Sequence, residues 1–428
     1  MTHIDIISNA DNVGGASRAA YRLYRTLLST NIKAKMTVCE KKTDDWMVSG
    51  PSNMYEKVKH LIRPRIGGNL MRLQRTPNVN PHSANILPSN MAAAINGSDA
   101  AIVNLHWIGG ETMSIEDLGR IRKPIVWTFH DMWAFCGSEH VVDDGPNARW
   151  REGYYPDNRP PCSSGLDIDR YTWNRKRRAW KNPIHVVTPS RWLADCVKQS
   201  ALMKDWPVSV IPNVLDTTAF KPLDRLFSRH ALSLPSDKKI ILFGAMGGSR
   251  SFNKGYDLLI EALKVLSTHQ GNILCVVFGQ SEPEHLPDIP FPIQWMGHIG
   301  DDATLALLYS AADVMIIPSR QENLPQSGTE AHACGCPVVA FNCTGLPEVV
   351  DHCVTGYLAT PYRPDDLAHG IEWVLEDKER HTNLRIAARK KTENLWSARS
   401  VIPAYLNVYE LAQLGHRATV DLRNLRVN

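Results

Sequence analysis

The chain has 428 residues, more than one hydrophobic core usually organises, so we expect two domains of about 200 residues each. With 43% hydrophobic and 21% charged residues, the composition is that of an ordinary globular protein and excludes a disordered or fibrous chain. A formal net charge of +4 over this length is too weak to indicate a nucleic-acid-binding protein.

Short apolar runs alternate with helical patterns along the first half of the chain. The residues at 16–30 predict a helix, because Ala20, Leu23 and Leu27 recur on one face. Runs rich in Ile, Val and Thr predict strands at residues 4–8, 34–39, 100–107, 124–130, 185–190 and 208–212.

The same rhythm returns in the second half. Strands are predicted at residues 238–245, 272–279, 313–319 and 337–341, and helices at 255–269, 304–312 and about 328–335. Continuous apolar strands separated by helices indicate parallel sheets covered on both faces. The predicted fold class is therefore α/β, with two doubly wound, Rossmann-like domains facing each other across a cleft. A nucleotide-sized ligand would lie in that cleft, beyond the carboxyl ends of the strands.

The domain boundary is predicted in the Pro-, Asp- and Ser-containing connection that follows the strand at 208–212. We assign residues 1–217 to an N-terminal domain and residues 218–395 to a C-terminal domain. A helix at about 396–415 is expected to pack back on the N-terminal domain.

The cysteines and the hydropathy of the chain indicate where in the cell the protein is expected. The nine cysteines are scattered through apolar or helical contexts, and the N-terminus has no leader pattern, so a reducing cytoplasm is expected. No apolar run is long enough to span a bilayer, which leaves peripheral membrane association. Cys334 and Cys336 form a single C-x-C that runs into an apolar strand, and this favours buried thiols over a zinc knuckle.

Two glycine-rich loops each follow a predicted strand and precede a helix. Gly14 and Gly15 in NADNVGGASR could let backbone amides approach a phosphate, or they could form a simple tight turn. Arg250 and Lys254 in GAMGGSRSFNKGYDLL suit a diphosphate, although a solvated charged loop explains them equally well.

A third segment, SRQENLPQSGTEAHACG, places Glu322 on a loop and Glu330 on the following helix. A carboxylate at a nucleotide site can accept hydrogen bonds from vicinal hydroxyls of a ribose or another sugar. The loop amides between the two glutamates would then face phosphate oxygens. A solvated helical position is the alternative for Glu330, but its small, apolar neighbours disfavour it.

These motifs together resemble the retaining family 4 glycosyltransferases of GT-B fold. The resemblance rests on ENLPQSGTE, GLPEVVDHCVTGYL, FGAMGGSRSFNKGYDLL, TPSRWLADCV, VIPNVLDTTAF, VNLHW and TFHDMWAFCG. It runs from Ile4 to about Val374 and is most similar to bacterial members that build exopolysaccharide, capsule or lipopolysaccharide O-antigen.

The resemblance implies a role for each matching residue. Donor binding would involve Gly14, Gly15, Arg250, Lys254, Asn323, Leu324 and Glu330. Lys254 would bind the diphosphate together with backbone amides, and Glu330 would bind the ribose. Many members carry the diphosphate arginine nearer the preceding strand than Arg250. The implied catalytic residues are His130, Glu322 and Lys254, with Glu322 on hydroxyls of the donor sugar and His130 at the reaction centre.

The implied activity is a retaining, metal-independent hexosyl transfer with no cofactor. The donor would be a UDP- or GDP-linked hexose, and the acceptor a saccharide, in particular a lipid-linked oligosaccharide in bacterial surface polysaccharide synthesis. A front-face displacement needs charge stabilisation more than a side-chain base. The alternatives are a catalytically silent sugar-nucleotide-binding partner of a synthase complex and a sugar-nucleotide 2-epimerase.

Acceptor recognition is expected in the N-terminal domain, with His106 and Trp107 as candidate contacts or as buried packing residues. Residues 54–75 and 170–181 each contain six Lys or Arg with apolar or aromatic side chains interleaved. Such segments suit an anionic membrane surface, although solvated helical faces or an acidic-sugar site fit as well. The Gly-, Pro- and Asp-containing segment 135–173 predicts a long loop, a frequent form of active-site lid.

Overall fold

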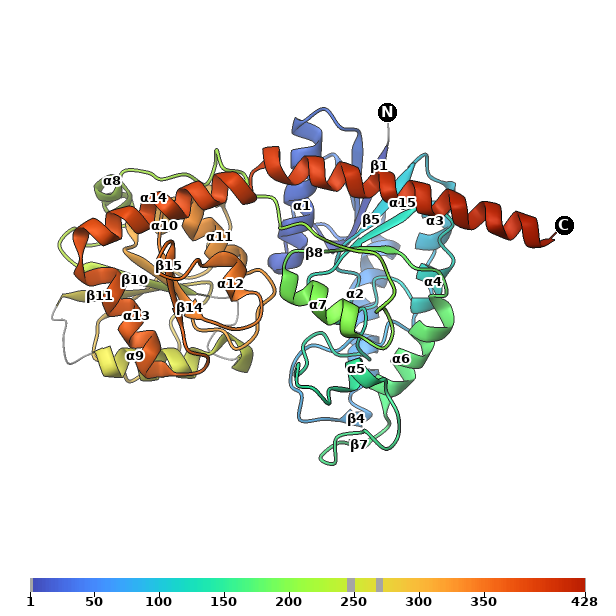
Figure 1. The fold of residues 1–428 in the computed structure, drawn as a ribbon, viewed down its shortest axis with the longest axis horizontal. Helices are drawn as coiled ribbons and strands as arrows, with labels where there is room; N and C mark the ends of the chain where they lie inside the picture. Colours follow the sequence, from blue (N-terminus) through green and yellow to red (C-terminus); the bar gives the residue numbers. More distant parts are fainter. Residues whose placement is uncertain (1–2, 245–250, 267–271, 428) are drawn as a thin grey trace. The chain divides into compact units, whose positions relative to one another are not determined.

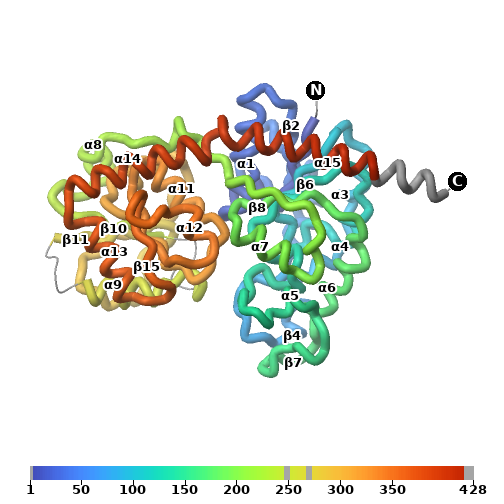
Figure 2. The backbone as a smooth tube through the Cα atoms, in the orientation of Figure 1, coloured from blue at the N-terminus to red at the C-terminus, as the bar shows by residue number. Residues whose placement is uncertain are grey.

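The computed structural model describes residues 3–244, 251–266 and 272–427, with side chains described up to residue 418. The chain divides into two units, Met1–Ile211 with Ile402–Asn428, and Pro212–Val401. Figure 2 traces the backbone of each unit. The structure thus places the boundary between Ile211 and Pro212, within the connection where the sequence analysis expected it at 217 and 218.

The N-terminal unit is built on a parallel sheet. Its described strands follow the order β3-β2-β1-β5-β6-β8-β9. The strands stay parallel, but successive strands are added on one side of β1 up to β3 and on its other side from β5 onward. The strands are β1 (Ile4–Ala10), β2 (Ala34–Glu40), β3 (Val48–Ser49), β5 (Ile102–Leu105), β6 (Ile125–Thr128), β8 (His185–Thr188) and β9 (Val208–Val210). A separate antiparallel pair joins β4 (Gln74–Arg75) to β7 (Ser164–Gly165).

The helices of this unit follow the strands in alternation. They are α1 (Gly14–Ser29), α2 (Met54–Met71), α3 (Met91–Gly97), α4 (Ile115–Gly119), α5 (Arg149–Glu152), α6 (Ile168–Ala179) and α7 (Arg191–Gln199). Helix α1 buries Ala20, Leu23 and Leu27, the face that its periodicity predicts. No helix within residues 3–244, 251–266 and 272–427 combines the length and the apolar composition needed to cross a membrane.

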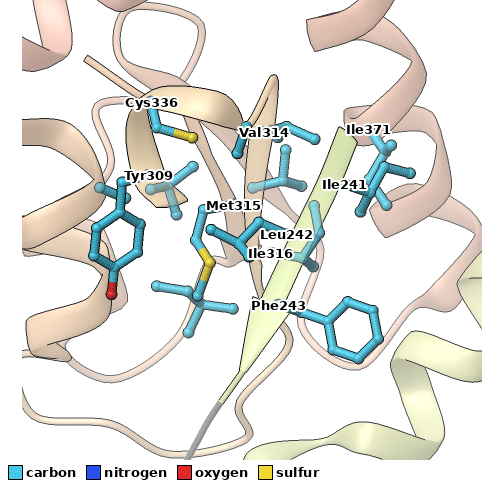
Figure 3. Close-up of a cluster of buried hydrophobic side chains, with 14 of the residues drawn as sticks. Ile241, Leu242, Phe243, Tyr309, Val314, Met315, Ile316, Cys336 and Ile371 are labelled. Carbon is cyan, nitrogen blue, oxygen red and sulfur yellow. The ribbon is translucent and has the colours of Figure 1, made fainter. Parts of the chain in front are cut away.

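The C-terminal unit has a second parallel sheet, in the order β12-β11-β10-β13-β14-β15 over its described strands. They are β10 (Lys239–Gly244), β11 (Ile273–Phe278), β12 (Ile293–Trp295), β13 (Val314–Ile317), β14 (Val338–Phe341) and β15 (Gly356–Ala359). Figure 3 shows the side chains of Ile241, Phe243 and Met315 in the core around β10 and β13. Their full burial explains the continuous apolar runs in the sequence.

Helices cover this sheet in two groups (Figure 1). One group contains α9 and α13, which pack against each other. In the other group, α10 packs against α8 and α11, and α11 also packs against α14. Their bounds are α8 (Arg225–Ala231), α9 (Tyr256–Leu266), α10 (Asp302–Ala311), α11 (Gln326–Ala333), α12 (Leu346–Val349), α13 (Pro364–Glu376) and α14 (Lys378–Leu395). Two doubly wound, Rossmann-like domains are therefore confirmed.

The last helix, α15 (Ala398–Val427), belongs to the N-terminal unit from Ile402 onward. The buried hydroxyl of Tyr409 donates to Oδ1 of Asn104 in β5 at 2.8 Å. The hydroxyl of Tyr405 lies 3.3 Å from that of Thr128 in β6. These contacts fasten the start of α15 to the middle strands of the N-terminal sheet.

The segment at 135–173 is largely irregular, as predicted, with α5 and β7 as short elements within it, but parts of it are packed into the protein. Phe135, Trp150 and Tyr154 are buried, and α6 already begins at Ile168. The buried amine of Lys176 donates to the backbone carbonyls of residues 133, 136 and 137. Burial lowers the pKa of this lysine to about 7. The segment is packed by aromatic side chains and anchored by an internal amine, two features that its polar composition does not reveal.

Candidate functional site

The C-terminal sheet reverses its strand order between β10 and β13, and ligands of such sheets bind beyond the carboxyl ends of the strands at this point. Lys254 lies in the connection from β10 to α9, and Glu322 follows β13. The structure therefore brings two of the predicted site residues, far apart in the sequence, to one edge of one sheet.

Lys254 and Glu322 form an ion pair. Nζ of Lys254 donates to Oε1 of Glu322, and Oγ of Ser319 lies 3.3 Å from the same oxygen. The side chain of Lys254 is 34% exposed and that of Glu322 is 16% exposed. Both groups are thus accessible enough to meet a ligand, yet sufficiently enclosed for their charges to interact strongly.

Arg320, which the sequence analysis did not single out, holds the loop that carries Lys254. Its guanidinium forms two hydrogen bonds with Asp257, of 2.8 and 2.6 Å, and donates to the carbonyl of Phe252 at 2.8 Å. Its backbone N–H donates to the carbonyl of Asn253 at 2.8 Å. A guanidinium suits this task because its planar fork can satisfy several acceptors at once.

Two glycines let the site loops approach their neighbours closely. Gly255, directly after Lys254, has φ +64°, and a Cβ there would lie 1.9 Å from the carbonyl oxygen of Pro318. A Cβ on Gly345 would lie 1.5 Å from the carbonyl oxygen of Asn323. The N–H of Gly345 donates to the carbonyl of Glu322 at 2.8 Å. Any other residue at either position would push the site loops apart.

The loop after Glu322 leads into α11. This helix has Pro325 as its N-cap, with no side-chain cap and no acidic residue in its first turn. Its N-terminal amides and dipole therefore favour an anion there. Asn323 is half-buried, whereas Leu324 is buried.

Glu330 lies within α11 and is only 2% exposed, so the solvated position considered for it is wrong. Its Oε2 accepts a hydrogen bond of 2.9 Å from the hydroxyl of Tyr309 in α10. Sequence reasoning missed Tyr309, because nothing along the chain marks which aromatic residue of a neighbouring helix meets a carboxylate.

The N-terminal sheet has its own reversal, between β1 and β5. Gly14 and Gly15 begin α1 directly after β1, and this helix also lacks a side-chain cap and a first-turn acid. The buried carboxylate of Asp11 accepts hydrogen bonds from the backbone amides of Lys42 and Thr43, at 2.8 and 3.0 Å. These bonds fix the loop that leads into α1.

His130 follows β6, and His106 follows the neighbouring strand β5. Nδ1 of His106 lies 3.0 Å from Nε2 of His130. Burial lowers the pKa of His130 to about 4, and it lowers that of His106 as well. Both imidazoles are therefore neutral at physiological pH.

Trp107 and Asp131 stand beside this pair, together with His140. The indole N–H of Trp107 donates to Oδ2 of Asp131 at 2.8 Å, and Nδ1 of His140 lies 2.7 Å from the same oxygen. Nε2 of His140 lies 2.8 Å from Oγ of Ser83. A pocket at this edge of the sheet is lined by His106, Trp107, Gly109, Thr128, His130 and His140.

The remaining predicted residues differ in what the structure shows of them. Arg250 lies outside the described residues. His106 is only 2% exposed, and Trp107 is half-buried, so both direct much of their surface into the protein. Cys334 and Cys336 are fully buried, which confirms them as buried thiols, and burial raises the pKa of both.

Comparison with known proteins relates the chain to one enzyme family. Residues 224–391, most of the C-terminal unit, match the family described as Glycosyl transferases group 1. The D-inositol 3-phosphate glycosyltransferase of Jonesia denitrificans is 26% identical over 313 residues, 68% of this chain and 67% of the relative. The lipopolysaccharide 1,2-N-acetylglucosaminetransferase of Salmonella typhimurium is 30% identical over 231 residues, 49% of this chain and 57% of the relative. Apart from the Jonesia denitrificans enzyme, the chain spans about half the length of the first curated relatives it matches.

Among solved structures, the Anabaena protein HepE in complex with UDP and glucose aligns with a TM-score of 0.63. The alignment covers 96% of this chain and 100% of HepE at 17% identity, so the likeness concerns the fold. The two parallel-sheet domains are those of the GT-B fold, as the sequence resemblance implied.

Proposed function

We propose, on the premise that residues 224–391 form a group 1 glycosyltransferase domain, that the protein transfers a hexose from a nucleoside-diphosphate sugar to a saccharide acceptor. One observation carries this proposal. The Lys254–Glu322 pair stands at the reversal of the C-terminal sheet, and Glu322 lies on the loop that leads into the start of α11, which has no side-chain cap. A cation, a carboxylate and the backbone amides of a helix N-terminus are groups that suit a diphosphate sugar.

In this proposal the chain supplies charge stabilisation. Lys254 balances the negative charge that builds on the departing diphosphate, and the amides at the start of α11 share that task. Glu322, released from Lys254, accepts hydrogen bonds from hydroxyls of the sugar. The diphosphate takes the proton of the acceptor hydroxyl, so the reaction proceeds with retention and without a side-chain base. Lys254 and the amides fill the role that a divalent cation plays in other transferases, which leads us to propose metal-independent transfer.

The proposed acceptor is a lipid-linked oligosaccharide of surface polysaccharide synthesis, with an anionic membrane beside it. Helix α2 supports this part, because it buries only Arg63 and Gly67 among its residues. Its exposed apolar side chains are Met54, Tyr55, Val58, Leu61, Ile62 and Ile66. Lys57, Arg65 and Arg72 are also exposed on or directly after this helix. Apolar and basic side chains together favour an anionic interface.

The second basic segment, 170–181, supports a membrane contact less well. The guanidinium of Arg175 is buried and donates to the carbonyls of Ala84 and Asn85, at 2.8 and 2.9 Å. Lys176 is buried as described above. Two of the six basic residues in segment 170–181 therefore form hydrogen bonds inside the protein and are not available to contact a membrane.

A thermal-shift series tests the donor site. UDP, GDP, ADP and their sugar conjugates are added to the wild type, to Lys254→Ala and to Lys264→Ala. The last variant is the matched control, since Lys264 lies on α9 in an exposed pair with Asp288. A nucleotide at 100 times its Kd stabilises by about 2.7 kcal/mol. We expect one nucleotide to stabilise the wild type and the control, and Lys254→Ala to lose most of that shift. A full shift in Lys254→Ala would contradict the assignment.

Turnover separates this proposal from its alternatives. Incubation with donor alone detects an epimerase, because that reaction needs no acceptor. A Glu322→Gln variant that keeps the fold but loses transfer excludes a silent binding partner. The anomeric configuration of the product, read from its NMR coupling constants, tests retention, and activity after chelation tests metal independence.

A further inference from the structure

We propose that His106 is a positioning residue that fixes the tautomer of His130, so that His130 carries its proton on Nδ1 and acts as a hydrogen-bond donor. The inference deepens the proposed function, on which the significance of His130 rests. It depends on the geometry of the histidine pair and on the burial of His106.

The backbone of His106 is fixed on both sides. Its N–H donates to the carbonyl of Ile7 in β1 at 2.9 Å. Its carbonyl accepts a hydrogen bond of 3.1 Å from the indole of Trp127 in β6. His106 therefore cannot shift along the sheet to follow a different partner.

The two rings are oriented for an N–H to N hydrogen bond. Their planes differ by 22°, their centroids are 5.2 Å apart, and the two facing nitrogens are 3.0 Å apart. The facing nitrogens are much closer together than the ring centroids, so the two rings meet edge to edge in nearly parallel planes. The lone pair of a neutral imidazole nitrogen lies in the ring plane, so this placement directs one N–H at the other lone pair. One of the two facing nitrogens must carry a proton and the other must not.

The second nitrogen of His106 decides which one it is. Nε2 of His106 is buried and has no hydrogen-bond partner within the described structure. If His130 donated, His106 would carry its own proton on this nitrogen, as a buried N–H without an acceptor. If His106 donates, the nitrogen is left with only a bare lone pair. Orphaned buried N–H groups are the rarer and costlier case, so His106 donates from Nδ1.

This arrangement sets the chemistry of His130. Its Nε2 accepts from His106, so the single proton of the neutral ring resides on Nδ1. Protonating His130 would place a second N–H against His106 and would drive the proton of His106 onto its buried Nε2. The pair thus opposes the imidazolium form, and burial lowers the pKa of both rings in the same direction. His130 then serves as a neutral donor to an oxygen of the substrate and does not act as a general base.

Nitrogen NMR on the full-length protein tests the tautomer directly. Histidine-selective 15N labelling and long-range 1H–15N correlation at pH 7 distinguish protonated from unprotonated ring nitrogens. His106→Asn and His130→Asn assign the two rings among the 16 histidines of the chain. We expect Nε2 to be unprotonated and Nδ1 protonated in His130 of the wild type. A proton on Nε2 of His130 would overturn the proposal.

Two substitutions at His106 give the functional readout. In His106→Asn, the amide N–H takes the place of Nδ1–H and can still donate to His130. In His106→Asp, a carboxylate takes the same place and can only accept, so His130 must move its proton to Nε2. We expect His106→Asp to lower kcat for transfer at least about tenfold more than His106→Asn does, the scale seen when groups that orient a site residue are changed.

The two readouts fail independently of each other. If the wild type shows the expected tautomer but transfers no sugar, the proposed function is wrong and the tautomer assignment stands. If His106→Asp moves the proton of His130 while kcat equals that of His106→Asn, the positioning role is overturned. A thermal midpoint measured for each variant shows whether a loss of activity reflects unfolding.

Discussion

Arg320 and Asp257 form a bidentate ion pair that connects the loop after β13 to the start of α9. The guanidinium also donates to the carbonyl of Phe252 and lies 3.9 Å from the centroid of the Phe252 ring. The loop at 252–254, which ends in Lys254, is thereby fixed relative to the loop that carries Glu322.

Replacing Arg320 tests whether these contacts matter for the proposed donor site. Arg320→Lys keeps the charge but loses the fork, so we expect nucleotide affinity, measured by calorimetric titration, to fall about tenfold. Arg363→Lys is the matched control, because Arg363 forms a similar pair with Asp365 at an exposed position. Equal affinities in both variants would show that the position of Lys254 does not depend on Arg320.

The hydroxyl of Tyr309 donates to one oxygen of the buried Glu330 carboxylate, and its removal should be costly. We expect Tyr309→Phe to lower the free energy of unfolding by about 1.5–3 kcal/mol, the range for hydrogen bonds to charged groups. Tyr357→Phe, which loses a hydrogen bond of 3.0 Å to the half-buried Asp366, should lose less because water can replace the hydroxyl there. Urea unfolding measures both. A smaller loss for Tyr309→Phe would mean that Glu330 does not depend on this tyrosine.

His332 should make stability depend on pH. It is fully buried beside Trp396, and burial, followed by the nearby Lys391, lowers its pKa from 6.5 to about 3. Between these values the unfolded chain binds a proton that the folded chain does not bind. The contribution is therefore fully present above pH 6.5, and stability falls as the pH drops toward 3, by up to about 1.4 kcal/mol per pH unit.

A His332→Phe variant removes this proton uptake while it keeps an aromatic ring beside Trp396. Its free energy of unfolding should fall less steeply than that of the wild type between pH 6.5 and 4.5, as followed by urea titrations. His285→Gln, which changes an exposed histidine, should keep the slope of the wild type. Parallel curves for His332→Phe and the wild type would show that folding does not change the pKa of His332.

The exposed face of α2 can be tested without any enzyme assay. Tyr55→Ser combined with Leu61→Ser removes two large apolar side chains, which are 76% and 60% exposed. We expect this variant to sediment less with vesicles of anionic lipid and to keep its thermal midpoint, since neither side chain is in the core. Leu226→Ser combined with Phe227→Ser, two similarly exposed residues of α8, is the control. Equal sedimentation of both variants would remove α2 as the contact surface.

Local patterns predicted the architecture well, because buried parallel strands and amphipathic helices leave periodic signals over a few residues. The strand at Ile4–Ala10, the apolar face of α1 and the alternation that follows them are all readable in this way. The family resemblance assigned Lys254 and Glu322 to the same sugar nucleotide, and the structure brings their side chains together. By contrast, the burial of aromatic residues in the segment at 135–173 could not be predicted, because they do not recur at the spacing of a helix or a strand.

The fold class, the two domains and the kinds of group at the proposed donor site could be predicted before folding is considered, since each depends on residue types at short spacings. Which side chains meet across long separations depends on the folded chain. It brought Arg320 to Asp257, Tyr309 to Glu330 and His106 to His130. It also turned Arg63 and Lys176 inward onto backbone carbonyls, where composition alone counted them as surface charge. The physical reason is that burial and hydrogen-bond geometry belong to the packed chain, and neither can be read from a residue and its neighbours in sequence.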